Sequence, residues 1–426
     1  SRPQSIGGTR PPLSRSDMLS RRSGMAGMYC IFLSFLLPGH CAPKIPEEGM
    51  TTVELIANAG YPVQEIRAIT RDGYILTMHR IPFGRNRVPS SAPRPTVLLQ
   101  HGLLASSADW VLNLPEQSLG FQMADAGFDV FLGNVRGNVY SRGHVNETVD
   151  RREYWRFSFD EMAQFDLDAM VDKALAISGS DHLHYVGYSQ GTMMMFARLS
   201  RDGLFGKKIK KFFALAPVGS VAHAKGPIVT IGRDLLPEIE LFIKLLGEEE
   251  FLPSSFIMKL LTRAACGASS LTNPLCENIL FALVGPNTNQ MNKTRLAAYL
   301  SHTPAGTSTQ NILHWAQMSR SGRTEMYDYG SESANLRYYG QPTPPQYDLS
   351  KVAVPTYLYH SPADLLADPE DVQYLLKTLP RGTVADNVVL RDFNHIDFVY
   401  GLRAATEIYD KIIREIKDHE SNVIRA

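Results

Sequence analysis

Gly187-Tyr188-Ser189-Gln190-Gly191 is a G-x-S-x-G pentapeptide that stands between an apolar segment and a helix-like run. The apolar segment is His184-Tyr185-Val186, and the run that follows is Thr192-Met193-Met194-Met195-Phe196-Ala197. A strand, this pentapeptide and a helix in succession are typical of a nucleophile elbow, a sharp turn that exposes a serine. The glycines allow the turn and hold the serine in a strained conformation. The pattern therefore predicts that Ser189 is a catalytic nucleophile.

A serine hydroxyl is a poor nucleophile at neutral pH, so it needs a histidine base that an acid orients. Two apolar runs near the C-terminus, residues 354–359 and 388–390, are typical of buried strands. Asp364 follows the first run and His395 follows the second. Because chemistry collects at the carboxyl ends of strands in open α/β sheets, the order Ser189, Asp364, His395 predicts a catalytic triad.

Three nearby residues are alternatives for the acid and the base. Asp368 precedes a proline and an amphipathic run, a pattern typical of a helix N-cap, so it already has a structural role. Asp397 stands two residues after His395, too close in sequence to orient it. His360 precedes the acid and breaks the expected order. Asp364 and His395 therefore remain the predicted pair.

Hydrolysis through a serine also needs two backbone N–H donors for the negative charge on the substrate oxygen. One donor is the N–H after the nucleophile, which here belongs to Gln190. The other comes from the turn after an earlier strand. Residues 95–100 have the pattern of such a strand, and His101-Gly102-Leu103-Leu104 follows them. Leu103 is the predicted second donor, and the alternative, that the His-Gly pair simply ends the strand, stays open at this point.

Further motifs stand in order along most of the chain. They are Gly60-Tyr61-Pro62 and residues 70–76, 101–107, 133–138, 157–162, 187–192, 214–218, 304–308, 364–369 and 394–398. Over residues 46–416 this series resembles the acid lipase family, which includes gastric lipase and lysosomal acid lipase. The resemblance implies an α/β-hydrolase fold, a mostly parallel doubly wound sheet, with an inserted helical cap.

The same resemblance implies the residues and the substrates. Ser189, Asp364 and His395 correspond to the family's triad, and Leu103 and Gln190 to its oxyanion hole. The implied substrates are triacylglycerols or cholesteryl esters, and no cofactor is expected.

The succession of patterns predicts how the chain is divided. Residues 46–218 alternate strand-like and helix-like runs, as in a doubly wound sheet. Residues 219–345 lose this alternation and carry apolar residues at helical spacing. They are predicted to form a helical cap or lid that offers acyl chains a dry slot. Residues 346–420 return to the core and end in a helix at 404–416.

Residues 1–42 are expected to lie outside the folded domain. Residues 1–17 are rich in Ser, Arg, Pro and Gly and are interpreted as upstream sequence. Two arginines then precede a short apolar run, residues 25–37, which is typical of a secretory signal peptide. A membrane anchor needs about 20 apolar residues, and Pro38 ends this run sooner. We expect a protein of the secretory pathway, extracellular or lysosomal, without a transmembrane segment in the mature chain.

The cysteines and the glycosylation sequons agree with a secretory route. Cys266 and Cys276 are the two cysteines of the predicted mature chain, and their spacing allows either a disulfide or two buried thiols. The family resemblance favours the disulfide. Asn146 and Asn292 each begin an N-x-T sequon, which secretory proteins often carry glycosylated.

The composition narrows the possible partners. The chain has 426 residues, 44% of them hydrophobic and 20% charged, with 43 basic and 43 acidic residues. A net charge near zero argues against a nucleic-acid partner. The sequence has no metal signature and no phosphate-binding loop. His182 and His184 stand two residues apart and fit a metal site on one strand face, but a surface pair at a strand edge is the favoured interpretation.

The sequence therefore predicts a serine esterase that acts on lipid esters at a lipid–water interface, through an acyl-enzyme. One alternative is a soluble hydrolase of small esters with the same fold, and the large apolar cap argues against it. The other is a non-catalytic lipid-carrying or yolk-type protein on this scaffold. Such relatives commonly lose a triad residue, and here none is lost.

Overall fold

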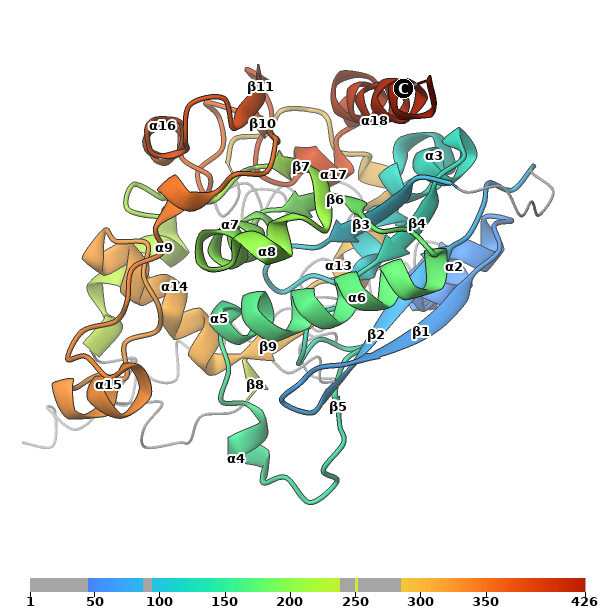
Figure 1. Ribbon diagram of the computed structural model, residues 1–426. Helices are drawn as coiled ribbons and strands as arrows, with labels where there is room; N and C mark the ends of the chain where they lie inside the picture. The colour runs from blue at the N-terminus through green and yellow to red at the C-terminus, as the bar shows by residue number, and fades with distance from the viewer. Residues whose placement is uncertain (1–44, 87–93, 238–249, 252–284, 426) are drawn as a thin grey trace, which may run out of the picture.

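The protein has a mixed β-sheet with helices on both faces, in a computed structural model that describes residues 45–86, 94–237, 250–251 and 285–425 (Figure 1). Helices α6 (Leu167–Ser178) and α7 (Gln190–Arg201) cover one face of the sheet, and α3 (Leu119–Ala126) and α18 (Asp410–Arg425) cover the other. No helix in the described ranges is long and apolar enough to span a bilayer.

The main sheet has the strand order β1-β2-β4-β3-β6-β7-β10-β11, with β5 paired to β2. All neighbours from β4 to β11 are parallel, whereas β2 pairs antiparallel with β1 and β4. The predicted doubly wound, mostly parallel sheet is therefore confirmed. The strands are β1 (Gln64–Ile69), β2 (Tyr74–Ile81), β3 (Thr96–Gln100), β4 (Asp129–Leu132), β5 (Gly143–His144), β6 (Leu183–Tyr188), β7 (Ile209–Leu215), β10 (Thr356–His360) and β11 (Val384–Val389).

The remaining helices lie around this sheet. In the core ranges they are α2 (Thr52–Asn58), α4 (Arg151–Tyr154), α5 (Phe159–Glu161), α8 (Gly203–Gly206), α16 (Pro369–Thr378) and α17 (Asp397–Tyr400). In the described parts of residues 219–345 they are α9 (Pro227–Asp234), α13 (Leu296–His302), α14 (Thr309–Ser321) and α15 (Glu332–Tyr339), with a small sheet of β8 (Glu250–Phe251) and β9 (Thr307–Ser308).

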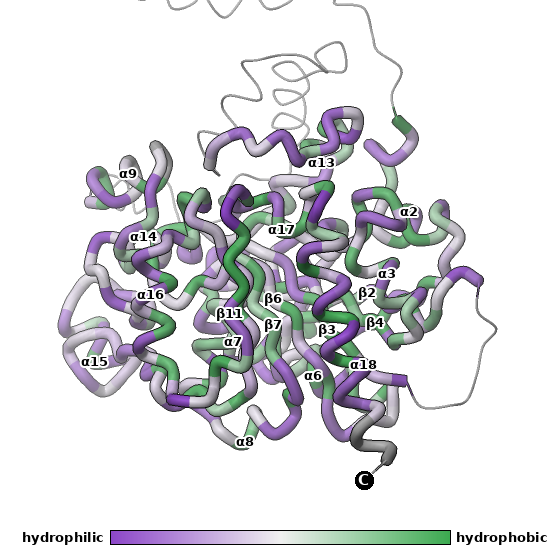
Figure 2. Tube along the Cα trace, turned by 90° about the horizontal axis from the view of Figure 1, so that it is seen from above, coloured by the Kyte–Doolittle hydropathy of each residue, from purple (hydrophilic) through white to green (hydrophobic). Residues whose placement is uncertain are grey.

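Apolar periodicity accounts for the burial of these elements. The inner strands β3, β4, β6 and β10 are buried at every position, as expected for parallel strands with helices on both faces. The C-terminal helical segment buries Ile408, Ile412 and Ile416, a stripe at four-residue spacing. Figure 2 shows hydrophobic residues concentrated along the inner strands and mixed with hydrophilic ones along α18.

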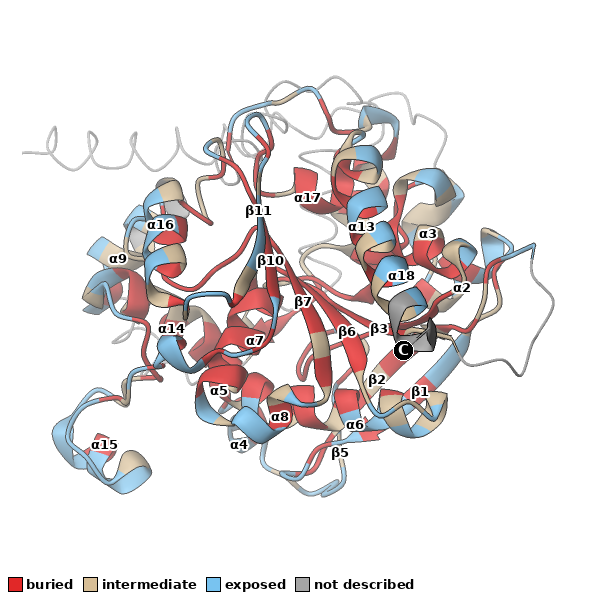
Figure 3. Cartoon of the chain, turned by 45° about the horizontal axis from the view of Figure 1, so that its top comes forward, coloured by how far each residue is buried: buried red, intermediate tan, exposed pale blue. Residues whose placement is uncertain are grey.

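The expectation of a buried strand at residues 388–390 is wrong for most of its length. β11 is the last strand of the sheet and pairs with β10 alone, so much of it faces solvent (Figure 3). Val389 is 50% exposed, and only Leu390, just after the strand, is buried. An apolar run of three residues does not distinguish an edge strand from an inner one.

Candidate active site

The turn between β6 and α7 has the geometry that the pentapeptide predicts. Ser189 is the single residue between the two elements, with φ 52° and ψ −117°, a conformation that a residue with a side chain rarely adopts. A Cβ at Gly191 would lie 2.5 Å from the carbonyl oxygen of Gln100, and one at Gly187 would lie 2.8 Å from that of Gly191. Both positions therefore need glycine for the backbones to approach this closely.

The structure brings the three predicted triad residues together. Nε2 of His395 lies 2.8 Å from Oγ of Ser189. Nδ1 of His395 lies 2.8 Å from Oδ2 and 3.0 Å from Oδ1 of Asp364. This arrangement fits a proton on Nδ1 that is donated to Asp364, which leaves the lone pair of Nε2 to accept from the serine hydroxyl.

Backbone donors and an aromatic ring fix the two partners of the serine. Oδ1 of Asp364 accepts from the N–H groups of Leu366 and Ala367, at 2.8 and 3.0 Å. The hydroxyl of Tyr188 donates to the carbonyl oxygen of His395 at 3.0 Å, and the two rings lie 5.3 Å apart. Asp364 and His395 are both buried. Sequence reasoning did not identify Tyr188, although its place beside the nucleophile was a usable signal.

The turn after β3 lies directly against Ser189. A Cβ at Gly102 would lie 3.1 Å from Cβ of Ser189. The buried His101 ring has Nδ1 2.8 Å from the carbonyl oxygen of Gly102, and its Nε2 accepts from the N–H of Val135 at 3.3 Å. Burial lowers the pKa of His101 to about 4, so the ring is neutral.

That histidine orients the peptide group that contains the second predicted donor. The carbonyl of Gly102 and the N–H of Leu103 belong to one planar trans peptide and point in opposite directions. A hydrogen bond from His101 to the carbonyl therefore sets the direction of the Leu103 N–H. The His-Gly pair does more than end the strand.

Gln190, the other predicted donor, has its side chain anchored by α14. Its Oε1 accepts from Nδ2 of Asn311 at 2.9 Å and from Nε1 of Trp315 at 2.8 Å. Helix α14 is thereby bonded to the first residue of α7, next to the nucleophile. Nothing in the sequence pointed to Asn311 or Trp315, because each lies more than a hundred residues from Gln190.

The three residues considered as alternatives for the acid and the base form hydrogen bonds with other groups. Asp368 caps α16 by accepting from the N–H of Glu370 at 2.9 Å, as its sequence context predicted. Oδ2 of Asp397 accepts from the N–H of Asn394 and from the hydroxyl of Thr288. Nε2 of His360 lies 2.9 Å from Oδ1 of Asn387.

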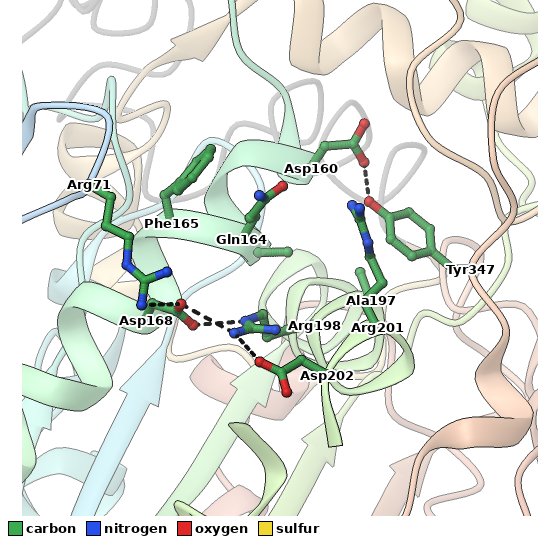
Figure 4. A pocket seen from close by; sticks show the side chains of 11 residues that line it. Arg71, Asp160, Gln164, Phe165, Asp168, Ala197, Arg198, Arg201, Asp202 and Tyr347 are labelled. Carbon is green, nitrogen blue, oxygen red and sulfur yellow. Dashed lines mark hydrogen bonds and ion pairs between the residues drawn. The ribbon is translucent and has the colours of Figure 1, made fainter. Parts of the chain in front are cut away.

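A polar pocket of about 270 Å³ lies at the far end of α7 from Ser189 (Figure 4). Arg198, in its wall, donates to Asp168 and Asp202, and the hydroxyl of Tyr347 donates to Asp160. Arg71 also lies 3.9 Å from Asp168. This pocket therefore offers ion pairs rather than the apolar wall that an acyl chain needs.

The structure describes the two glycosylation sequons but not the other features of the predicted secretory route. The signal-peptide segment and the pair Cys266 and Cys276 lie outside the described residues. Asn146 is exposed and Asn292 is partly buried. In each sequon, Oδ1 of the asparagine accepts from the hydroxyl of the threonine two residues later.

A doubly wound sheet with a serine on a strand-to-helix elbow, and with a histidine and an aspartate from later strand ends beside it, defines the α/β-hydrolase class. Residues 95–402 match the α/β-hydrolase fold family, and residues 52–114 match the partial α/β-hydrolase lipase region. The chain belongs to the lipases of this family, as its motifs indicated. It is a carboxylic ester hydrolase that acts on lipids.

Individual relatives support this assignment over nearly the whole chain. The chain is 48% identical to the lipase lipl-1 of Caenorhabditis elegans, over 90% of this chain and 95% of that protein. It is 42% identical to the gastric triacylglycerol lipase of Mus musculus, over 93% and 97%. A solved structure of a monoglyceride lipase variant from Saccharomyces cerevisiae has a TM-score of 0.51 at 14% identity, covers 89% of this chain and 98% of that one, and supports the fold alone.

Proposed function

We propose that this protein cleaves long-chain lipid esters, triacylglycerols or cholesteryl esters, through an acyl-enzyme on Ser189. The observation that carries the proposal is the hydrogen-bonded series from Ser189 through His395 to Asp364, on a strained elbow at the carboxyl edge of the sheet. The substrate class is supported by the relatives, one of which is a triacylglycerol lipase by name.

Each residue has a defined part in the proposed reaction. Nε2 of His395 takes the proton of the Ser189 hydroxyl while Oγ attacks the ester carbonyl carbon. The N–H groups of Leu103 and Gln190 stabilise the oxyanion. His395 then protonates the departing alcohol, and a water molecule that it activates releases the fatty acid. Asp364 holds the proton on Nδ1 throughout.

The cap is part of the same proposal. Residues 219–345 are proposed to cover the site and to supply the apolar slot for the acyl chain. One support is the bonding of α14 to Gln190 beside the nucleophile. Another is the small apolar cluster of Leu236, Leu313 and Tyr327, which joins two parts of this segment. Exposing apolar lid surface to water costs about 25 cal/mol per Å², so a lipid–water interface is expected to favour the open state.

We also propose a secretory route for the protein. A signal peptide within residues 1–42 would direct the chain into the secretory pathway, to the extracellular space or the lysosome. A disulfide between Cys266 and Cys276 and glycans on Asn146 and Asn292 would follow from that route. Expression in secretory cells, with N-terminal sequencing and a glycosidase mobility shift on Asn146→Gln and Asn292→Gln variants, tests these points together.

The decisive experiment is a panel of esters that differ in chain length and head group, offered as dissolved monomers and as emulsions from pH 4 to 8. Hydrolysis should rise steeply on emulsified long-chain esters, and a fluorophosphonate probe should label the protein at Ser189. Higher kcat/KM on dissolved short-chain esters, without any interfacial rise, would favour a small-ester hydrolase instead.

A further inference from the structure

A second group of histidines lies at the opposite end of β6 from the nucleophile. His182 stands just before β6 and His184 is its second residue, while Glu420 reaches them from α18. Figure 3 shows α18 lying beside the sheet at this end. The sequence favoured a surface pair at a strand edge, but only His182 is partly exposed. His184 is 1% exposed, which is incompatible with a surface role.

The three side chains bring their ligand atoms into one small volume. Nε2 of His184 lies 2.9 Å from Oε1 of Glu420, and Nε2 of His182 lies 3.7 Å from the same oxygen. One ligand atom from each residue can be chosen so that all three lie within 4.8 Å of one another. In a tetrahedral zinc site with bonds of about 2.0 to 2.2 Å, ligand atoms are roughly 3.3 to 3.6 Å apart. Small rotations of the partly buried side chains of His182 and Glu420 bring the cluster to that spacing.

We propose that His182, His184 and Glu420 bind a Zn²⁺ ion that joins the start of β6 to the C-terminal helix. Two imidazole nitrogens and one carboxylate oxygen suit zinc and disfavour Mg²⁺ and Ca²⁺, which prefer oxygen ligands alone. The ion lies at the far end of β6 from Ser189, so its role is structural: it attaches α18 to the sheet and takes no part in ester hydrolysis.

A neighbouring carboxylate holds His182 in a tautomer that suits metal binding. Oδ1 of Asp181 lies 2.5 Å from Nδ1 of His182, an outer-shell contact that keeps the proton on Nδ1 and leaves Nε2 free as a ligand.

The surroundings supply a candidate fourth ligand, His419. The His419 ring lies 6.2 Å from the His184 ring, and its Nε2 is a buried nitrogen without a hydrogen-bond partner in the described part of the chain. A rotation of His419 or a water molecule completes the tetrahedron. The nearest lysine of the adjoining strand, Lys211, is paired with Glu415 of α18.

Direct zinc binding tests the site. The full-length mature protein, stripped with a chelator and dialysed, is titrated with ZnCl₂ by calorimetry at pH 7.5, and bound zinc is counted by elemental analysis. We expect one zinc per chain and a rise in Tm of about 3 °C at a hundredfold excess over Kd. X-ray absorption should show imidazole scattering with Zn–N distances of about 2.0 Å.

Two variants at partly exposed positions keep the test falsifiable. His182→Gln and Glu420→Gln should each bind zinc at least tenfold more weakly and lose the Tm rise, while their zinc-free Tm stays near that of the wild type. The matched control is His223→Gln, another histidine beside carboxylates, which are Glu370 and Asp371 in the first turn of α16; it should bind zinc as the wild type does. A wild type that binds no zinc, or a Glu420→Gln variant with unchanged affinity, would overturn the proposal.

Discussion

Two histidine–carboxylate pairs lie at opposite ends of β6 and differ in what the histidine faces. In the pair His395 and Asp364, the carboxylate occupies Nδ1, and Nε2 faces the hydroxyl of Ser189. In the pair His184 and Glu420, the carboxylate lies at Nε2, and Nε2 of a second imidazole, His182, approaches the same carboxylate oxygen. We propose that the same two side-chain types provide a proton shuttle at one end and a set of metal ligands at the other.

The comparison shows that a histidine beside a carboxylate does not by itself indicate catalysis. The group that lies beside the pair decides the chemistry. A hydroxyl at the other ring nitrogen gives a general base with its nucleophile. A second ligand near the shared oxygen gives a cation site. The four predictions below test this distinction, from the largest expected effect to the smallest.

Removing the hydroxyl of Ser189 should leave the pair of His395 and Asp364 without a nucleophile. Ser189→Ala should fold normally and lose hydrolysis by roughly four to six decades, as in other serine triads. Turnover of an emulsified long-chain ester and labelling by a fluorophosphonate measure this loss. Labelling of the alanine variant at full strength would show that another serine is the nucleophile.

Removing the charge of Asp364 should slow hydrolysis because His395 would lose its orientation. Asp364→Asn is expected to lower kcat by about 10⁴-fold with little change in Tm, because His395 would lose the partner that sets its tautomer. The control is Asp368→Ala, which removes the N-cap of α16 and should cost roughly 1 kcal/mol of stability while turnover survives. A reversal of these two results would exchange the roles of the aspartates.

The third prediction concerns a buried carboxyl group, Asp109, whose partner is a tyrosine instead of a histidine. Asp109 accepts from the hydroxyl of Tyr400, and burial raises its pKa to about 7. Since the pKa in the unfolded chain is about 3.9, the folded state holds this proton more tightly. The stability that it contributes is full below pH 4 and is lost as the pH rises toward 7, by at most about 4 kcal/mol.

Asp109→Asn should therefore flatten the fall of the unfolding free energy between pH 4 and pH 7, measured by urea denaturation at several pH values. The control is Asp392→Asn. Its hydrogen bond to Arg403 lowers the pKa of Asp392, so that variant removes a contribution of the opposite sign, one that is lost as the pH falls. An unchanged pH profile in Asp109→Asn would mean that Asp109 is ionised in the folded protein at neutral pH.

The smallest expected effect concerns Trp315, whose hydrogen bond holds the side chain of Gln190, a proposed oxyanion donor. Trp315→Phe keeps an aromatic side chain, although a smaller one, and removes the N–H that binds Oε1 of Gln190. We expect kcat to fall about tenfold with KM nearly unchanged, because misplacement of a catalytic group by less than an ångström weakens transition-state contacts. Ile312→Val on the same helix removes a methylene group but no donor and should leave kcat within twofold. Equal losses of kcat in both variants would indicate general damage to α14.

Much of the active site could be predicted because its requirements are local. The glycines at 187 and 191 are needed by contacts within one turn and with the adjacent strand, so they appear as a short motif. Asp364 and His395 follow strands whose carboxyl ends meet at one edge of a parallel sheet, so their order along the chain was informative. The N-cap role of Asp368 was likewise set by its immediate neighbours.

Only the tertiary structure revealed contacts between residues that are distant in sequence. His184 and Glu420 are 236 residues apart, and Gln190 and Trp315 are 125 apart. Such pairs depend on strand register and on the packing of helices over the sheet, which no short motif encodes. The exposure of β11 was also set by its position at the edge of the sheet. The sequence by itself determined the fold class, the elbow and the order of the triad, because backbone turns and apolar periodicity are local properties. The anchoring of Gln190 and the histidine cluster arose only when packing brought distant segments together.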